Sequence, residues 1–357
     1  GLISLVSAVR SRPPAISFEA MKRNPMSDFL ADFQNHIANQ SFFRGKEKIL
    51  IACSGGPDSI ALLRLMVALA PKHRWQLGVL HYNHRLRKSA GNDLRFVRSL
   101  SKELGLTFYS GSGNVRREAV KTGASIEEAA RKMRYDFFLG TAKKLGIQKI
   151  ALGHTLDDQA ETVLMRILQG TGLRGLQGIR EVNRREGVDL IRPLLKFSKK
   201  EILNFCRAAK VGFCKDESNR SVRFFRNRIR LKLLPVLKRD FNPRITEALA
   251  RIPAIASREI ALLDRLEAQA WKAAVKKAGT KRIELKREVF FQMESPLQFR
   301  IIERALKKIH PQSGLSYEAW ERIRRGFSRA RNRWSLPKDI DFALTPKTVT
   351  VFKKSSS

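Results

Sequence analysis

Residues 49–59 read Ile-Leu-Ile-Ala-Cys-Ser-Gly-Gly-Pro-Asp-Ser, an apolar strand that runs directly into a loop of small residues. Gly55 and Gly56 let the backbone turn without hindrance from a Cβ atom, so successive N–H groups and the hydroxyls of Ser54 and Ser59 can face one concavity. The helix expected over 59–70 adds the positive end of its dipole. The stretch therefore predicts a strand, loop and helix that together bind a phosphate group.

The same loop argues against one large class of phosphate-binding proteins. The sequence holds no Gly-x-x-x-x-Gly-Lys-Ser/Thr match, so transfer of a terminal phosphate by a kinase or a motor ATPase is disfavoured. Asp58 instead offers a carboxylate for Mg²⁺. Two glycines also occur in ordinary turns, but the whole run of six residues after an apolar strand favours the phosphate site.

The pattern Ser-Gly-Gly-x-Asp-Ser resembles the loop of the N-type ATP pyrophosphatases, or PP-loop superfamily, whose members split ATP between its α and β phosphates to adenylate an oxygen. The resemblance implies that Asp58 holds Mg²⁺. It also implies that ATP is bound by Ser54, Gly55, Gly56, Pro57, Asp58 and Ser59.

Composition indicates the kind of partner. The chain has 70 Lys and Arg against 33 Asp and Glu, which gives a formal charge of +37. Like charges repel one another in a compact protein unless phosphates neutralise part of them. The balance therefore favours nucleic acid as a ligand over a basic surface that serves solubility alone.

Cysteine spacing and hydropathy indicate the cellular environment of the protein. Cys53, Cys206 and Cys214 are spaced too widely for a disulfide framework or a Cys-x-x-Cys pair, which fits a reducing cytoplasm. No apolar run approaches the roughly 18 residues that cross a bilayer, so a role within the membrane is disfavoured.

The order of the predicted elements indicates an α/β domain followed by a second, helical domain. Strands expected over 48–53, 75–81, 106–109 and 149–152 alternate with helices expected over 59–70, 92–104, 125–145 and 156–168. Such alternation predicts a Rossmann-like parallel sheet with helices on both faces, the PP-loop ATPase fold, with polar residues along its carboxyl edge.

Changes of composition predict the domain boundaries in this chain of 357 residues. We expect a poorly ordered leader or expression remnant over 1–25, the catalytic domain over 26–220 and a basic linker helix over 221–240. A mainly helical, basic domain is expected over 241–335, and a hairpin of strands 340–344 and 348–352 with a frayed tail over 336–357.

The expected fourth strand ends in Gly-His-Thr-Leu-Asp-Asp-Gln-Ala-Glu-Thr at 153–162. Asp158 and Glu161 are three apart on one helical face, and His154 lies four residues before Asp158. Two carboxylates at a phosphate site repel each other unless a metal ion or an ammonium group lies between them. Helix capping of Asp158 by Thr155 is the alternative.

Three further stretches carry polar or glycine-rich sequence. His81 to Arg87 follow the second strand and suit a nucleotide, or form a solvated basic loop. Arg131 stands on the helix over 125–145, where it stabilises charge on an α-phosphate or belongs to a salt-bridge ladder with Glu127. The glycine-interrupted segment 169–176 lets a bulky ligand approach the backbone.

Taken in order, these motifs resemble the tRNA(Ile)-lysidine synthetase family from about Lys48 to Leu237. The resemblance implies adenylation of the wobble cytidine of tRNA(Ile) with a CAU anticodon, then attack by free L-lysine with release of AMP. It places lysine on Asp158 and Glu161. It implies the catalytic residues Asp58, Arg131, His154, Asp158 and Glu161 and the cofactors ATP and Mg²⁺. The sequence does not reveal the oligomeric state, and a homodimer is one assembly to test.

The basic residues of the linker helix and of the second domain are expected to hold tRNA phosphates, which positions the RNA without reading its sequence. These residues are Arg223, Arg226, Arg228, Arg230, Arg324 and Arg331. Bases could stack on Phe224, Phe225, Trp320 or Trp334, but core packing is the favoured interpretation of these aromatic residues.

Three other functions fit parts of the sequence. A PP-loop tRNA thiolase needs paired cysteines or an iron–sulfur cluster, which the cysteine spacing does not indicate. A small-molecule amidating synthetase leaves the charge of +37 unexplained. An RNA-binding protein without catalytic activity would tolerate Asp58→Asn and Glu161→Gln.

Overall fold

The computed structural model describes residues 25–85, 90–214, 224–327 and 332–354. The leader expected over 1–25, except for Pro25, lies outside the described residues, as do Arg223 and Arg331. The chain divides into two compact units, residues 1–254 and 255–357.

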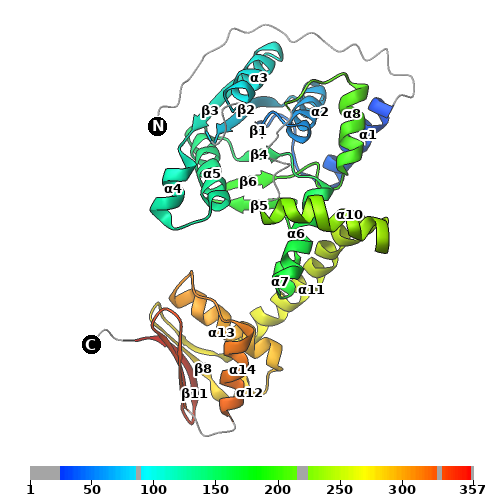
Figure 1. The fold of residues 1–357 in the computed structure, drawn as a ribbon. Coiled ribbons are helices and arrows are strands. Elements are labelled where there is room, and N and C mark those ends of the chain that lie inside the picture. Colours follow the sequence, from blue (N-terminus) through cyan, green and yellow to red (C-terminus); the bar gives the residue numbers. More distant parts are fainter. Residues whose placement is uncertain (1–24, 86–89, 215–223, 328–331, 355–357) are drawn as a thin grey trace. The chain divides into compact units, whose positions relative to one another are not determined.

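The first unit is built on a sheet with the strand order β3-β2-β1-β4-β6-β5 (Figure 1). All neighbouring strands are parallel except β5, which runs antiparallel to β6. The strands are β1 (Lys48–Ala52), β2 (Gln76–Asn83), β3 (Thr107–Ser112), β4 (Lys149–Leu152), β5 (Val182–Arg185) and β6 (Val188–Ile191). Since the chain winds outward from β1 to β3 and then returns to β4 on the other side of β1, the switch point lies between β1 and β4.

Strand β1 is buried on both faces. Ile49 and Ile51 pack in one hydrophobic cluster, whereas Leu50 and Ala52 pack in another. The apolar run without polar alternation that predicts this strand is typical of a parallel strand covered by helices on both sides, so the expected fold class is confirmed.

The two clusters identify the helices on each face. One cluster holds residues of α1 (Pro25–Asn39), α2 (Pro57–His73), α3 (Ala90–Glu103) and α8 (Lys199–Ala208). The other holds residues of α5 (Ile126–Lys144), against which α4 (Val115–Thr122) packs. Helices therefore cover both faces of the sheet.

A helical stretch packs on α6 (Leu156–Leu168), the helix that follows β4 and is itself followed by the short α7 (Leu173–Leu176). Ala160 and Val163 of α6 share a cluster with Ile229 and Leu234. The stretch consists of α9 (Phe225–Arg228), the π-helical η3 (Ile229–Leu233), α10 (Leu234–Val236), η4 (Leu237–Phe241) and the start of α11 (Ile245–Ala274). This packing brings the basic residues after 224 to α6.

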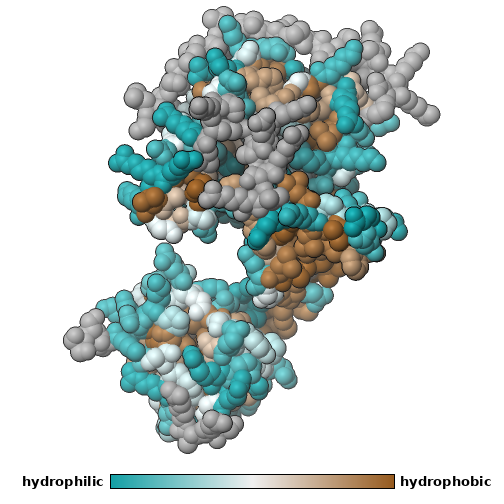
Figure 2. All heavy atoms as spheres, in the orientation of Figure 1, coloured by the Kyte–Doolittle hydropathy of each residue, from teal (hydrophilic) through white to brown (hydrophobic). Residues whose placement is uncertain are grey.

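Apolar side chains gather on the surface around α10 and the start of α11 (Figure 2). Leu231, Val236 and Phe241 are among the exposed ones. Within the described residues, no helix combines the length and the apolar character that a membrane crossing requires.

The second unit combines helices with an antiparallel sheet of order β7-β8-β11-β10-β9. It contains the end of α11, β7 (Val275–Ala278), β8 (Arg282–Lys286), α12 (Arg287–Phe291), α13 (Ser295–Ile309), α14 (Tyr317–Gly326), β9 (Arg333–Leu336), β10 (Ile340–Leu344) and β11 (Thr348–Lys353). The predicted hairpin corresponds to β10 and β11. Strands β7, β8 and β9 were not predicted, because each is only four or five residues long and contains Lys or Arg.

Two of the aromatic residues considered for base stacking lie inside this second unit. Trp320 and Trp334 are 2% and 3% exposed and belong to its hydrophobic core. The structure confirms core packing for both.

The end of β4 lies tightly against the start of α2, and this contact can be tested by adding one methyl group. A Cβ atom on Gly153 would lie 3.1 Å from the backbone N and Cα atoms of Ser59, so Gly153→Ala is expected to cost about 1–3 kcal/mol of folding free energy. A Cβ atom on Gly140 of α5 would meet no described atom within 4 Å, and Gly140→Ala is expected to stabilise the protein by up to about 1 kcal/mol. Chemical denaturation of both variants measures the difference, and equal effects would contradict the tight contact.

Candidate functional site

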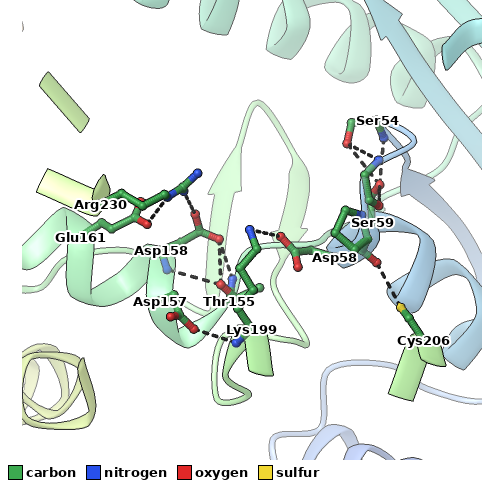
Figure 3. Close-up of polar contacts among 12 residues, drawn as sticks. Ser54, Asp58, Ser59, Thr155, Asp157, Asp158, Glu161, Lys199, Cys206 and Arg230 are labelled. Carbon is green, nitrogen blue, oxygen red and sulfur yellow. Dashed lines mark hydrogen bonds and ion pairs between the residues drawn. The ribbon is translucent and has the colours of Figure 1, made fainter. Parts of the chain in front are cut away.

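The loop after β1 is held in shape by its own serines. The Ser54 amide donates to Ser59 Oγ at 3.1 Å, and Ser59 Oγ donates to the Gly56 carbonyl at 2.9 Å (Figure 3). Gly55 has a φ of 94°, a conformation that other residues rarely adopt. His81, buried on β2, donates from Nδ1 to the Cys53 carbonyl at 2.9 Å, so the neighbouring strand fixes the residue just before the loop.

The loop leads into a helix start that suits an anion. Gly56 is the N-cap of α2 and supplies no side-chain acceptor, and Pro57 occupies the first turn. The amides of this turn therefore have no acceptor from the cap, and the helix dipole adds positive potential.

Asp58 stands in the first turn of α2, beside a lysine from another element. Lys199 Nζ lies 3.4 Å from Asp58 Oδ2, while Asp58 Oδ1 is buried and has no hydrogen-bond partner among the described residues. Burial raises the pKa of Asp58, and the charge of Lys199 opposes that rise. A buried acceptor without a partner calls for a cation or a donor at this position.

Lys199 was not singled out from the sequence. It is the first residue of α8, whose N-cap Ser198 and Glu201 form a capping box. The Lys199 amide also donates to Asp157 Oδ2 at 2.7 Å, which ties the start of α8 to the start of α6. A sequence signal for Lys199 did exist. The capping box of Ser198 and Glu201 follows β6 closely and marks a helix start at the carboxyl edge of the sheet.

Asp158 caps α6 with one oxygen and forms an ion pair with the other. Its Oδ2 accepts hydrogen bonds from the Thr155 amide at 2.9 Å and the Thr155 hydroxyl at 3.1 Å. Its Oδ1 lies 2.8 Å from Arg226 Nη2. The capping that the sequence offered as an alternative is thus present together with an ionic role.

Glu161 is buried, at 2% exposure, and both of its oxygens contact arginines, of which Figure 3 labels Arg230. Arg226 Nε donates to Oε2 at 2.7 Å, and Arg230 donates from Nε to Oε1 at 2.5 Å and from Nη2 to Oε2 at 2.9 Å. The two carboxylates therefore do share a cationic partner, as expected, but that partner is a pair of arginines from the helical stretch after 224.

His154 lies near Asp158, and its pKa is far below the usual value for histidine. Burial, together with the charges of Arg192, Arg134 and Arg226, lowers the pKa of His154 to about 3. Its Nδ1 atom is buried without a hydrogen-bond partner among the described residues. The imidazole is therefore neutral at physiological pH.

A cavity of about 530 Å³ opens beside His154. Arg131 lines it together with His154, so the structure brings these two predicted residues to one place. Among the described residues, six arginines line it: Arg131, Arg166, Arg174, Arg180, Arg192 and Arg226.

The other predicted RNA contacts lie elsewhere. Arg228 places its guanidinium over the Phe225 ring at 5.3 Å. Arg324, in the second unit, pairs with Glu321 on the same helix at 2.8 Å and is about half exposed.

The three cysteines, far apart in sequence, all lie beside the loop of residues 54–59, called the phosphate loop below for its predicted role. Cys53 precedes it, Cys206 Sγ lies 3.8 Å from the Pro57 carbonyl, and the Cys214 amide donates to the Gly55 carbonyl at 2.9 Å. Burial raises the pKa of both Cys53 and Cys206 to about 11. Within the described part of the chain, no group of three His, Cys, Asp or Glu side chains is arranged to hold a metal ion.

The ion pair of Asp158 makes a prediction about acid stability. Burial is the largest single influence and would raise the pKa of Asp158, but Arg226, the Thr155 amide and Arg230 are among the groups that together outweigh it, so the pKa is lowered. A carboxyl group with a lowered folded pKa contributes stability that is present above its unfolded pKa of about 3.9 and is lost as pH falls through the folded value. Asp158→Asn should therefore lower stability at neutral pH and reduce the further loss on acidification.

Denaturant midpoints measured from about pH 7 down to about pH 2 test this linkage. Asp136→Asn is the control, because Asp136 pairs with Lys132 on an exposed face of α5 and such pairs contribute little. An Asp158→Asn curve parallel to that of the unchanged protein would contradict the prediction.

Comparison with known proteins agrees with this geometry. A family model described as a PP-loop domain matches residues 26–237. A tRNA(Ile)-lysidine synthase of Dehalococcoides mccartyi is 36% identical over 77% of the chain and 56% of its own length. One from Symbiobacterium thermophilum is 35% identical over 80% of the chain and 59% of its own length. The chain thus spans somewhat more than half the length of these two relatives.

A further relative and a solved structure complete the comparison. The tRNA(Ile)-lysidine synthase of a Nostoc species is 30% identical over 78% of the chain and 83% of its own length. The U34-tRNA thiolase NcsA from Methanococcus maripaludis superposes with a TM-score of 0.53 at 16% identity, over 64% of the chain and 78% of its own, which shows the shared fold. With a phosphate loop at β1 and a carboxylate pair on α6, the chain belongs to the PP-loop superfamily and, within it, to the tRNA(Ile)-lysidine synthase family.

Proposed function

We propose that this protein uses ATP to join free L-lysine to the wobble cytidine of tRNA(Ile) with a CAU anticodon. The observation that carries the proposal is the position of the Asp158 and Glu161 pair, which β4 and α6 hold beside the phosphate loop of β1 and α2. A loop that binds phosphates and a carboxylate pair that binds an amino group are the two sites that such a reaction needs.

In the first step, the loop residues Ser54 to Ser59 hold the phosphates of ATP. The cytosine O2 atom attacks the α-phosphorus, the bond to the β-phosphate breaks, and pyrophosphate leaves. Lys199, beside Asp58, is well placed to pair with phosphate oxygens of ATP. Arg131 at the neighbouring cavity offsets charge that builds on the α-phosphate.

Asp58 fits the Mg²⁺ that the PP-loop family implies. Its buried Oδ1 has no hydrogen-bond partner among the described residues, and Mg²⁺ is commonly held by one or two carboxylates together with substrate phosphates. When bound, the ion neutralises charge on the phosphates of ATP.

In the second step, the lysine side chain binds at Asp158 and Glu161. Its ε-amine, once deprotonated, attacks C2 of the adenylated cytosine, and AMP leaves with the C–O bond electrons. Carboxylates favour the charged ammonium, so they bind lysine but do not by themselves deprotonate it.

His154 acts as a positioning group in this proposal. With a pKa near 3 it does not retain a proton at neutral pH, so the proton of the ammonium passes to water or to the departing phosphate. The neutral ring can still donate or accept one hydrogen bond and so orient the cytosine or the amine.

The rival functions meet specific obstacles. A thiolase of the cluster-bearing type needs sulfur ligands grouped around the cluster, and the described residues contain no group of three His, Cys, Asp or Glu side chains arranged to hold a metal ion. An RNA-binding protein without activity has no use for a buried carboxylate oxygen such as Asp58 Oδ1, which has no hydrogen-bond partner among the described residues. A homodimer and a cytoplasmic setting stay predictions.

The decisive experiment incubates the protein with ATP, labelled lysine and a tRNA(Ile) transcript with a CAU anticodon. We expect ATP-dependent incorporation of label and release of AMP. Asp58→Asn and Glu161→Gln are each expected to slow incorporation by about 100-fold or more, whereas the exposed Asp136→Asn leaves it unchanged. Release of ADP, or no incorporation by a folded sample, would refute the proposal.

A further inference from the structure

We infer that the arginine-lined cavity beside His154 binds the backbone phosphates of the single-stranded RNA segment that carries the target nucleotide. The inference rests on the proposed function and assigns an RNA site within the first unit. It shares Arg226 with the sequence-based expectation, but the other five lining arginines were not among the residues expected to hold RNA.

The charge of the cavity favours an anion. Six arginines line it, and none of the described residues that line it is Asp or Glu. Arg192 is only 4% exposed. It donates from Nη1 to the Arg180 carbonyl at 2.7 Å, but its Nε atom is buried with no partner in the described part of the chain. A buried guanidinium with an unused donor at a cavity wall is satisfied by an acceptor that enters the cavity.

The size of the cavity and the uncharged polar side chains in its lining favour a nucleotide over a small anion. A volume of about 530 Å³ is typical of sites that take a nucleotide-sized ligand. Thr162, Gln169, Gln177 and Asn183 add hydroxyl and amide groups that can bond to base edges or to ribose. Free pyrophosphate shares the phosphate chemistry but leaves much of this space and these groups unused.

The position of the cavity connects it to the reaction. His154 lines the cavity, and its neighbour Gly153 packs against the backbone of Ser59 in the phosphate loop. A nucleotide that enters between the arginines therefore approaches the place where the α-phosphate of ATP would lie.

The test removes two cavity charges that the proposed chemistry does not use. Arg174→Gln with Arg180→Gln is compared with Arg116→Gln with Arg117→Gln, which removes the same charge from exposed positions on α4 outside the cavity. The probe is an anticodon stem-loop RNA with a CAU anticodon, titrated from about 50 mM to about 200 mM salt.

We expect the cavity variant to bind the RNA at least about tenfold more weakly, with a salt slope that is smaller by about 0.7 for each RNA phosphate that is no longer neutralised. The α4 variant should resemble the unchanged protein, and both variants should keep their ATP affinity. Unchanged RNA binding by the cavity variant would overturn the inference, as would weakened binding of pyrophosphate with RNA binding intact. These binding results stand apart from the incorporation assay, so failure of either proposal can be recognised separately.

A second inference comes from the oxygens of Asp158 and Glu161. All four already accept hydrogen bonds, one from Thr155 and the others from Arg226 and Arg230. An arriving lysine ammonium therefore competes with the two arginines for these oxygens. Arg226 also lines the cavity, so a phosphate there competes with the carboxylates for its guanidinium. We infer that RNA binding draws Arg226 away from Asp158 and Glu161 and so opens the lysine site.

Calorimetry of lysine binding with and without the stem-loop RNA tests this coupling. RNA should strengthen lysine binding by about tenfold in the unchanged protein, a typical coupling between two sites. Arg226→Gln should bind lysine with the same affinity whether or not RNA is present. Equal lysine affinity with and without RNA in the unchanged protein would refute the coupling, and that measurement needs no variant.

Discussion

The ion pairs between α6 and the helical stretch after 224 determine how the site is assembled. Glu161 is almost fully buried, and an unpaired carboxylate there would be costly, so Arg226 and Arg230 have to be present for α6 to keep its place. In return, the carboxylates hold the start of the helical stretch against the α/β sheet. Ala160, Val163, Ile229 and Leu234 form an apolar cluster, which adds hydrophobic stabilisation to the same contact. One small region thus joins packing, charge balance and the candidate substrate site.

Much of the first unit was predictable from local patterns. The apolar run before Ser54 and the glycines that follow it predict β1, the loop and the start of α2, because each of these depends on residues adjacent in sequence. The parallel sheet follows from the alternation of elements, and Asp158 and Glu161 were placed together by helical spacing. The hairpin of β10 and β11 was also predicted, since its strands are apolar and flank a short turn.

What the sequence left open depends on contacts between distant residues. Nothing near Arg226 indicates that its partner is Glu161, 65 positions earlier, and the basic stretch reads equally well as an RNA-binding surface. Lys199 reaches Asp58 only because α8 begins at the same sheet edge. Strand β8, Arg-Ile-Glu-Leu-Lys, does alternate between exposed and buried residues, but five residues between charged neighbours are too short a signal to separate from a loop.

The burial of Cys53 and Cys206 beside the phosphate loop affects how these thiols react with oxidants. Nucleophilic attack by cysteine requires the thiolate, and with pKa values near 11 Cys53 and Cys206 supply very little of it at physiological pH. Peroxide and alkylating agents should therefore react slowly with these two side chains, even though both border the loop that leads into α2. The fold thereby places these two thiols beside the loop of residues 54–59 while keeping them largely protonated.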